Sequence, residues 1–205
     1  LMINVYQNSN IDLVAPDGMV YNLPDVKDKN WAVDKTVYQI YVEGDKAYLA
    51  CGFGVVVLNL TKKEIEDTYI VGEAASKVPI YGFTSDDERF YALSDDAIFT
   101  APKQGANLLD FHVWHQSVIV CPDTIQARNL YVAANRLYTL HNETVLMQYD
   151  QEDWTNFYVG DYGSVSWNAC GEYIVLTGGK KGIDVYTTGM LPVKHYDISA
   201  NYALI

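Results

Sequence analysis

Few residues in this sequence have the types and spacing that catalysis or metal binding requires. His112 and His115 are three residues apart, and on a β-strand this spacing directs the two side chains to opposite faces, where they cannot share a metal ion. Two acidic clusters, at residues 86–88 and 95–96, lack the alternating oxygen ligands and fixed glycine of a calcium loop. We interpret these clusters as solvated turns, with weak cation binding as the alternative, and we predict no bound metal and no cofactor.

The usual patterns of nucleophiles and phosphate-binding loops are also missing from the sequence. Ser164 and Ser199 lack the G-x-S-x-G context of a hydrolase, and the three cysteines have no paired histidine signal. Residues 177–182 (TGGKKG) do not have the spacing of a P-loop and precede an expected strand, which indicates a long hairpin instead. The sequence therefore predicts no enzyme of these classes.

A third set of residues has the chemistry to bind an anionic sugar. Lysine side chains bind phosphate and carboxylate groups, and an aromatic ring beside them can pack against a sugar ring. The candidate ligand-binding residues are Lys27, Lys29, Trp31, Lys35, Lys180 and Lys181. Acidic neighbours, among them Asp25, Asp28 and Asp34, work against the binding of an anion there. Whether these side chains converge depends on the elements that carry them.

Those elements repeat along the chain. Five tyrosines are separated by 42, 43, 40 and 42 residues: Tyr6, Tyr48, Tyr91, Tyr131 and Tyr173. Four of the five follow a polar turn, and each precedes a short apolar strand, a second turn and a second apolar strand. A period near 40 with several short strands in each period is typical of a β-propeller. We therefore predict an all-β fold of about five four-stranded blades of some 42 residues each, either a five-bladed ring or part of a larger one.

The repeats predict one propeller domain over residues 1–205, with four complete blades at residues 37–79, 80–116, 117–163 and 164–198. Residues near 111–114 are expected to form the outer strand of the third blade, and residues 130–133 the second strand of the fourth. The first blade, at residues 1–36, lacks an inner strand, which residues 199–205 could supply to close a five-bladed ring. Alternatively, those residues begin a sixth blade. We favour this second interpretation because both ends of the sequence read as severed strands.

Propeller topology predicts where the candidate residues meet. The loops that join one blade to the next lie on the same face as the turns between the second and third strands of each blade. These loops hold Lys27, Lys29, Trp31, Lys35, Lys77, Arg136, Lys180 and Lys181, and Trp154 is expected near the same face. The sequence thus predicts one binding face with mixed charge.

Composition limits the classes of partner. The chain has 26 acidic and 14 basic residues and a net charge of −12, which argues against a nucleic-acid partner because phosphate contact needs a concentrated basic surface. No apolar run approaches the ~18–20 residues that cross a bilayer. Cys51, Cys121 and Cys170 are an odd set that allows at most one bridge, and we expect them to be buried.

The first half of the sequence also resembles a known family. The resemblance is carried by residues 8–13 (NSNIDL), 21–25 (YNLPD), 44–60 (GDKAYLACGFGVVVLNL) and 67–72 (DTYIVG), and by residues 107–111 (NLLDF) with Trp114. These segments look like the N-terminal propeller of PorZ-type proteins of the Bacteroidetes type IX secretion system. The match is closest over residues 8–114, and its motifs are strands and turns, with no catalytic signature.

The resemblance implies an exported protein at the cell surface, the outer membrane or the periplasm, built from propeller modules and a C-terminal sorting domain. Members of this family are expected to bind anionic lipopolysaccharide and to work with other proteins of the secretion complex. The first functional hypothesis is therefore a non-catalytic binding and assembly module.

Two other functions remain open at this point. One is the extracellular sensor propeller of a two-component regulator, which the parent protein would reveal by a membrane span and a kinase after residue 205. The other is a propeller enzyme, which would need a polar cluster on the inner strands. The inner strands offer Tyr38, Gln39, Tyr41, Tyr81, Thr84 and Asn168, without a strong acid–base pair among them.

Overall fold

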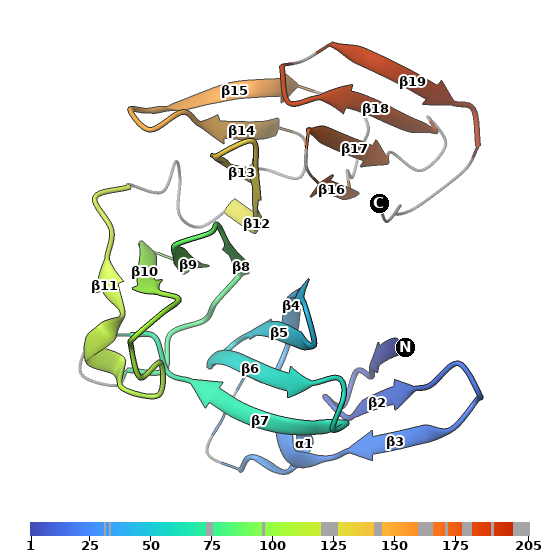
Figure 1. The fold of residues 1–205 in the computed structure, drawn as a ribbon, viewed down its shortest axis with the longest axis vertical. Helices are drawn as coiled ribbons and strands as arrows, with labels where there is room; N and C mark the ends of the chain where they lie inside the picture. The colour runs from blue at the N-terminus through green and yellow to red at the C-terminus, as the bar shows by residue number, and fades with distance from the viewer. Residues whose placement is uncertain are drawn as a thin grey trace. The chain divides into compact units, whose positions relative to one another are not determined.

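The computed structural model describes residues 1–30, 32, 34–72, 76–95, 97–119, 127–141, 145–159, 166–170, 172–177, 182–189 and 191–198. Within these residues the chain forms five antiparallel sheets, each made of consecutive strands (Figure 1). The predicted all-β propeller fold is confirmed. The chain divides into two compact units, Leu1–Phe83 with Asp87–Val120 and Thr84–Asp86 with Cys121–Ile205, which we describe in turn. The single-domain boundary of residues 1–205 stays a prediction.

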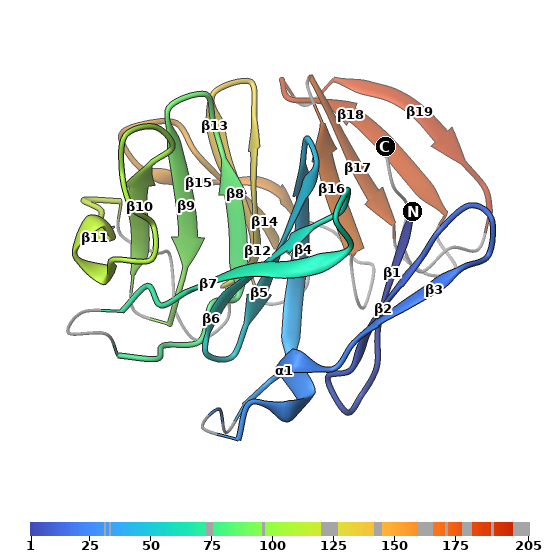
Figure 2. The same cartoon turned by 60° about the horizontal axis from the view of Figure 1, so that its bottom comes forward.

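The first unit contains three sheets. The first sheet is three-stranded and comprises β1 (Met2–Val5), β2 (Ile11–Val14) and β3 (Val20–Leu23). The short helix α1 (Asp25–Asp28) follows, and then the second sheet of β4 (Val37–Glu43), β5 (Lys46–Cys51), β6 (Gly54–Asn59) and β7 (Glu64–Tyr69). The third sheet comprises β8 (Gly82–Ser85), β9 (Arg89–Leu93), β10 (Ile98–Pro102) and the two-residue β11 (His115–Gln116), and it lies in this unit except for Thr84 and Ser85 of β8. Neighbouring strands are joined by short connections that reverse the chain, except that residues 103–114 connect β10 to β11 (Figure 2).

The second unit contains two four-stranded sheets. One comprises β12 (Ala127–Ala133), β13 (Arg136–His141), β14 (Val145–Tyr149) and β15 (Trp154–Val159). The other comprises β16 (Ser166–Cys170), β17 (Tyr173–Thr177), β18 (Ile183–Thr187) and β19 (Pro192–Tyr196). These two sheets pack through a small apolar cluster that includes Tyr138, Leu140, Ile174 and Leu176.

The second sheet is apolar on both of its faces. Val56 and Leu58 point to one face, where they pack with Ile11 and Leu13 of the first sheet. Val57 points to the other face, which packs with aromatic residues of the third sheet. All five of these side chains are fully buried. This burial explains why β6 reads as a continuous apolar run instead of an alternating one.

The turn between β5 and β6 requires a glycine at position 54. Its φ is +136°, a conformation that residues with a side chain rarely adopt, and a Cβ at this position would collide with the carbonyl oxygen of Tyr69. The glycine therefore allows β6 to leave the turn close against the end of β7.

The predicted outer strand of the third blade, near residues 111–114, is wrong. Phe111–Val113 is a 3₁₀ helix, and the side chain of Asp110 caps it by accepting a hydrogen bond from the backbone N–H of His112 at 3.0 Å. The Trp114 indole N–H donates to the carbonyl oxygen of Leu108 at 3.1 Å, which places this ring in the core. The capped turn competes successfully with strand pairing, so the outer strand is confined to β11.

The regularly spaced tyrosines do not occupy equivalent positions. Tyr131 lies on β12, the first strand of its sheet, and pairs with Tyr138 on β13. The corresponding pair in the second sheet is Tyr41 with Tyr48, so the counterpart of Tyr48 is Tyr138. The prediction of a second strand at residues 130–133 is therefore wrong. Within each pair the two tyrosines are seven residues apart. The period of about 42 residues therefore led to Tyr131, the partner of Tyr138, instead of to Tyr138 itself.

The segment expected to complete the first blade, residues 199–205, lies outside the described residues. The described part of the first sheet has three strands, as predicted for residues 1–36.

Replacing Phe83 with alanine should lower the free energy of unfolding by about 3–5 kcal/mol. Phe83 is fully buried and lies 5.1 Å from the Tyr48 ring and 5.5 Å from the Phe90 ring, so its removal leaves a cavity between two sheets. Urea unfolding followed by circular dichroism measures the change. Val42→Ala, on a side chain that is 53% exposed, is the control and should change the free energy by less than about 0.5 kcal/mol. Similar losses in both variants would contradict this account of the core.

Candidate functional site

The segment between β3 and β4 carries most of the predicted binding residues. Lys27, Lys29 and Lys35 lie on it and are described by the structure, whereas Trp31, Lys180 and Lys181 lie outside the described residues. The site is therefore built here from the described part of this segment, which we call the α1 loop and define as residues 24–36.

Two apolar residues fix the α1 loop to the core. Val26 is fully buried and Ala32 is 7% exposed, and both join the cluster between the first and second sheets. The backbone N–H of Asp28 donates to the carbonyl oxygen of Pro24 at 2.9 Å and closes the short helix α1. Because the apolar side chains face the core, the polar side chains of the loop are left at its surface.

Lys27 and Lys35 lie next to each other on the α1 loop, and Lys35 has a structural role. The Lys35 ammonium donates a hydrogen bond to the backbone carbonyl oxygen of Lys27 at 2.5 Å. The Ser9 hydroxyl in turn donates to the carbonyl oxygen of Lys35 at 3.1 Å. Lys35 therefore helps to hold the loop closed, while the Lys27 side chain is exposed.

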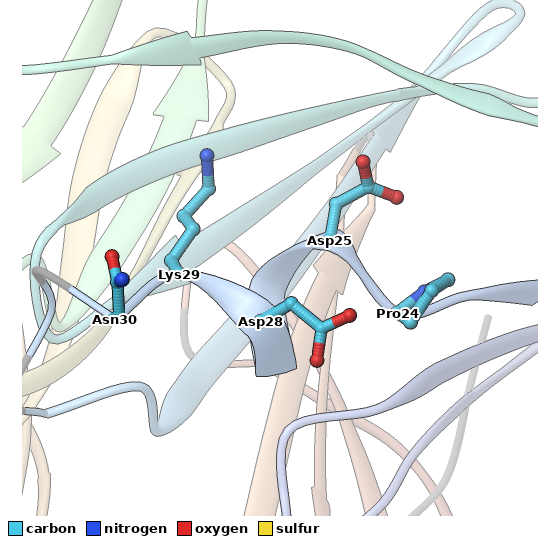
Figure 3. A pocket seen from close by; sticks show the side chains of 5 residues that line it. All are labelled: Pro24, Asp25, Asp28, Lys29 and Asn30. Carbon is cyan, nitrogen blue, oxygen red and sulfur yellow. The ribbon is translucent and has the colours of Figure 1, made fainter.

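A hollow of about 330 Å³ opens beside α1 and is shown in Figure 3. It is lined by Pro24, Asp25, Asp28, Lys29 and Asn30. The side chains of Asp25 and Lys29 point to the same side of the segment (Figure 3). Two carboxylates outnumber one ammonium among the described lining residues. The hollow therefore suits hydroxyl groups, which carboxylate and amide groups can bind, better than it suits an anion.

Asp34 ties the α1 loop to the turn between β5 and β6. Its carboxylate accepts hydrogen bonds from the Thr36 backbone N–H at 2.9 Å and from the Tyr38 hydroxyl at 2.7 Å. The side chain packs so closely against Gly52 that any Cβ on that residue would overlap it. Gly52 also donates its N–H to the carbonyl oxygen of Thr36 at 3.1 Å. The blade-to-blade loop and the second turn of the sheet thus share one face, as the topology predicted.

Burial and hydrogen bonding act in opposite directions on Asp34. Partial burial raises the pKa of its carboxyl, but the hydrogen bonds from Thr36 and Tyr38 outweigh this effect, so the pKa lies below its usual value. For Tyr38 the two effects add, since burial and then the hydrogen bond to Asp34 raise its pKa to about 12. The Tyr38 ring also packs edge-on against Tyr81, with centroids 4.8 Å apart. Tyr38 therefore stays protonated at neutral pH and acts as a hydrogen-bond donor.

Sequence reasoning treated Asp34 only as a charge opposing anion binding and missed its structural role. The signal that could have found it is Asp34 two residues before Thr36, the spacing of an Asx turn. The contact with Gly52 has no comparable signal in the sequence, because it depends on the pairing of distant strands.

The predictions for Arg136 and Trp154 are wrong. Arg136 begins β13 directly after the first turn of its sheet, and Trp154 begins β15 after the third turn. These turns lie at the opposite end of the strands from the blade-to-blade loops, because successive strands alternate in direction. Both errors follow from the misplaced second strand. Lys77 is exposed on the connection between β7 and β8, as expected.

The polar residues of the inner strands are engaged in holding the fold. The Gln39 side-chain oxygen accepts a hydrogen bond from the backbone N–H of Phe83 at 3.1 Å, and the residue is 4% exposed. Tyr38 is bound to Asp34, and Tyr41 packs against Tyr48 with centroids 6.0 Å apart. The Asn168 side chain lies outside the described residues. Among the described residues, no group of three or more histidine, cysteine or acidic side chains is placed to hold a metal ion.

Comparison with known proteins identifies the family. Residues 1–115 match the model of the family described as TSS9, PorZ, N-terminal beta-propeller domain. The chain belongs to this family. The solved structure of PorZ from Porphyromonas gingivalis superposes on 96% of the chain with a TM-score of 0.75 at 20% identity. The chain spans about a quarter of the length of that PorZ chain, 25%. PorZ is described as an essential bacterial surface component of the type IX secretion system.

Sensor proteins share the fold. The extracellular domain of a putative hybrid two-component system from B. thetaiotaomicron superposes on 95% of the chain with a TM-score of 0.56 at 14% identity, and the chain covers 28% of it. The extracellular domain of a putative one-component system from the same organism superposes on 84% of the chain with a TM-score of 0.53 at 13% identity, and the chain covers 23% of it. Among curated proteins no match was found. No helix in the described part of the chain is long and apolar enough to cross a membrane.

Asp34→Asn should lower the free energy of unfolding by about 1 kcal/mol near neutral pH, because it weakens two hydrogen bonds to a charged acceptor. The folded pKa of Asp34 is lower than the unfolded pKa of about 3.9, so the carboxylate stabilises the fold above about pH 4, and this contribution is lost as the pH falls through the folded pKa. Urea unfolding of both proteins between about pH 3 and pH 7 should therefore show the difference shrinking in acid. Asp87→Asn, on an exposed turn, is the control. A difference that grows in acid would contradict the assignment.

Proposed function

We propose that the chain is a non-catalytic binding and assembly module in a surface component of a type IX secretion system. The observation that carries the proposal is the family match over residues 1–115, which the similarity to PorZ supports at the level of the fold. On this proposal the parent protein is exported to the cell surface, the outer membrane or the periplasm. Its partners are other proteins of the secretion complex.

The proposed ligand of the module is anionic lipopolysaccharide, bound by Lys27, Lys29 and Lys35 together with Trp31, Lys180 and Lys181. The exposed Lys27 and the adjacent Lys35 ammonium support a contact at the outer surface of the α1 loop. The hollow beside α1 does not contribute positive charge, since Asp25 and Asp28 line it with Lys29. The anionic groups would therefore contact the lysine tips, and the sugar hydroxyls would face the carboxylates.

A sensor function is the second candidate, because the two B. thetaiotaomicron extracellular domains share the fold. Their TM-scores of 0.53 and 0.56 are lower than the 0.75 of PorZ, and they support the fold alone. The segment of the parent protein that follows residue 205 separates the candidates. A sorting domain supports the secretion module, whereas a membrane span with a kinase supports the sensor.

Reversing the charge of Lys27 and Lys29 together, by Lys27→Glu and Lys29→Glu, should weaken binding of purified anionic lipopolysaccharide at least about tenfold. The two changes remove attractive contacts and add repulsion at the same surface. Calorimetric titration at two salt concentrations measures the effect, and the wild-type affinity should fall at the higher concentration because exposed charges are screened.

The matched control is the double variant Lys62→Glu and Lys194→Glu, which changes the net charge equally at two exposed lysines elsewhere. This control should bind nearly as wild type. Equal weakening in the two double variants would indicate a general charge effect, and unchanged binding in the first would remove the α1 loop from the proposal.

A further inference from the structure

A second hollow lies on the third sheet, at the end of the sheet where β9 and β11 begin and β10 ends. Strand pairing sets its composition. Thr100 on β10 pairs with His115 on β11, and Pro102 on β10 pairs with Arg89 on β9. Directly paired residues and residues two apart on one strand share a face of a sheet, so these four side chains lie on the same face. Figures 1 and 2 show the three strands side by side.

The opposite face of these strands belongs to the core of the first unit. Phe90 and Ala101, which alternate with the residues above, are buried in the cluster shared with the second sheet. The face that carries Arg89 and His115 is exposed at both of these residues. The hollow on this face has a volume of about 420 Å³, within the range of about 300–1,000 Å³ that small-ligand sites occupy. We call it the rim hollow.

The described lining of the rim hollow contains positive and hydrogen-bonding groups without any carboxylate. It consists of Arg89, Thr100, Ala101, Pro102, His115, Gln116, Ser117 and Val118. This composition is unusual for a chain in which acidic residues outnumber basic ones by 26 to 14. It also differs from the hollow beside α1, where two aspartates oppose one lysine.

The donors of the rim hollow match an oxyanion. Arg89 takes part in an interaction within the protein, and the five N–H donors of a guanidinium give it the capacity to bind a ligand in addition. The Ser117 hydroxyl oxygen accepts a hydrogen bond from the backbone N–H of Ile119 at 3.2 Å, so this hydroxyl can offer its proton to a ligand. The planar fork of arginine fits phosphate and carboxylate groups, and hydroxyl and imidazole N–H groups complete their hydrogen bonding.

We propose that the rim hollow binds a small oxyanion, a phosphate monoester or a carboxylate, between Arg89 on β9 and His115 on β11. Thr100 and Ser117 supply hydroxyl donors to the same group. This site shares no residue with the α1 loop and does not depend on lipopolysaccharide binding there.

The test is a titration of the protein with inorganic phosphate at constant ionic strength, followed by ¹H–¹⁵N NMR. The expected result is that the shifted signals cluster in the lining residues that have a backbone N–H, which are residues 89, 100, 101 and 115–118. Arg89→Gln should weaken phosphate binding about tenfold, and His115→Gln should weaken it severalfold, because each loses a charge-assisted or neutral hydrogen bond. Both side chains are exposed, so the variants should fold, and the spectra report folding directly.

Two control variants match these changes. His112→Gln alters an exposed histidine three residues before His115, and Lys62→Gln removes an exposed positive charge. Both should bind phosphate as wild type does. The proposal is overturned if the shifts are spread over surface lysines, or if Arg89→Gln and His115→Gln bind phosphate with wild-type affinity.

Further titrations separate the two sources of the oxyanion. Glucose 6-phosphate presents a phosphate monoester, glucuronate presents a carboxylate, and glucose presents neither. Binding of either charged sugar, or of both, at the same residues supports the proposal and identifies the group. Equal binding of glucose would overturn it, because the site would then recognise hydroxyl groups instead of charge.

Discussion

The burial of the second sheet on both faces is the constraint on which the rest of the first unit depends. Val55, Val56, Val57 and Leu58 have no exposed surface, and they pack against the first sheet on one face and against the third sheet on the other. Each fully buried side chain of this size contributes about 1.5–3 kcal/mol relative to an exposed one. A polar group in such a layer needs a partner, as Gln39 finds in the backbone of Phe83. Chemistry is therefore confined to the loops and to the outer strand ends.

This confinement makes the contact between Asp34 and Gly52 important for the α1 loop. The loop leaves the first sheet, crosses the end of the core and enters β4, and its position is fixed where Asp34 packs on the Gly52 backbone. One carboxylate satisfies both the Thr36 amide and the Tyr38 hydroxyl, so the loop and the strand it enters are held by the same group. With Val26 and Ala32 as apolar anchors, the loop presents its remaining polar side chains from a defined backbone.

Much of the fold could be predicted from the sequence because its signals are local. Apolar strands and polar turns repeat at the length of a blade, and these features led to five sheets in the correct order. The predictions failed where a choice between two local structures depended on distant residues. The Asp110 cap and the burial of Trp114 convert an expected strand into a 3₁₀ helix. At Tyr131, only the register with Tyr138 shows which of two tyrosines is equivalent to Tyr48.

The candidate sites were less predictable for the same reason. Lys27 and Lys35 could be placed together because they lie on one short loop, but the donation from Lys35 to the Lys27 carbonyl has no signal in the sequence. Arg89 and His115 are 26 residues apart, and they share a face only because β10 pairs with both of their strands in one particular register. A shift of one residue in either ladder would place one of these side chains on the core face.

The α1 loop and the rim hollow differ in where acidic side chains lie relative to the basic ones. Screening limits the reach of exposed charges to about 8–10 Å at moderate salt, so the net charge of −12 does not decide whether a local surface can hold an anion. On the α1 loop, Lys27, Lys29 and Lys35 are matched by Asp25, Asp28 and Asp34 within the same eleven-residue stretch, and an anion there must compete with carboxylates already present. At the rim hollow, the described lining offers cationic and hydroxyl donors without a competing carboxylate. Among the residues that the structure describes, the lining of the rim hollow therefore contributes no carboxylate of its own, whereas the hollow beside α1 contributes two.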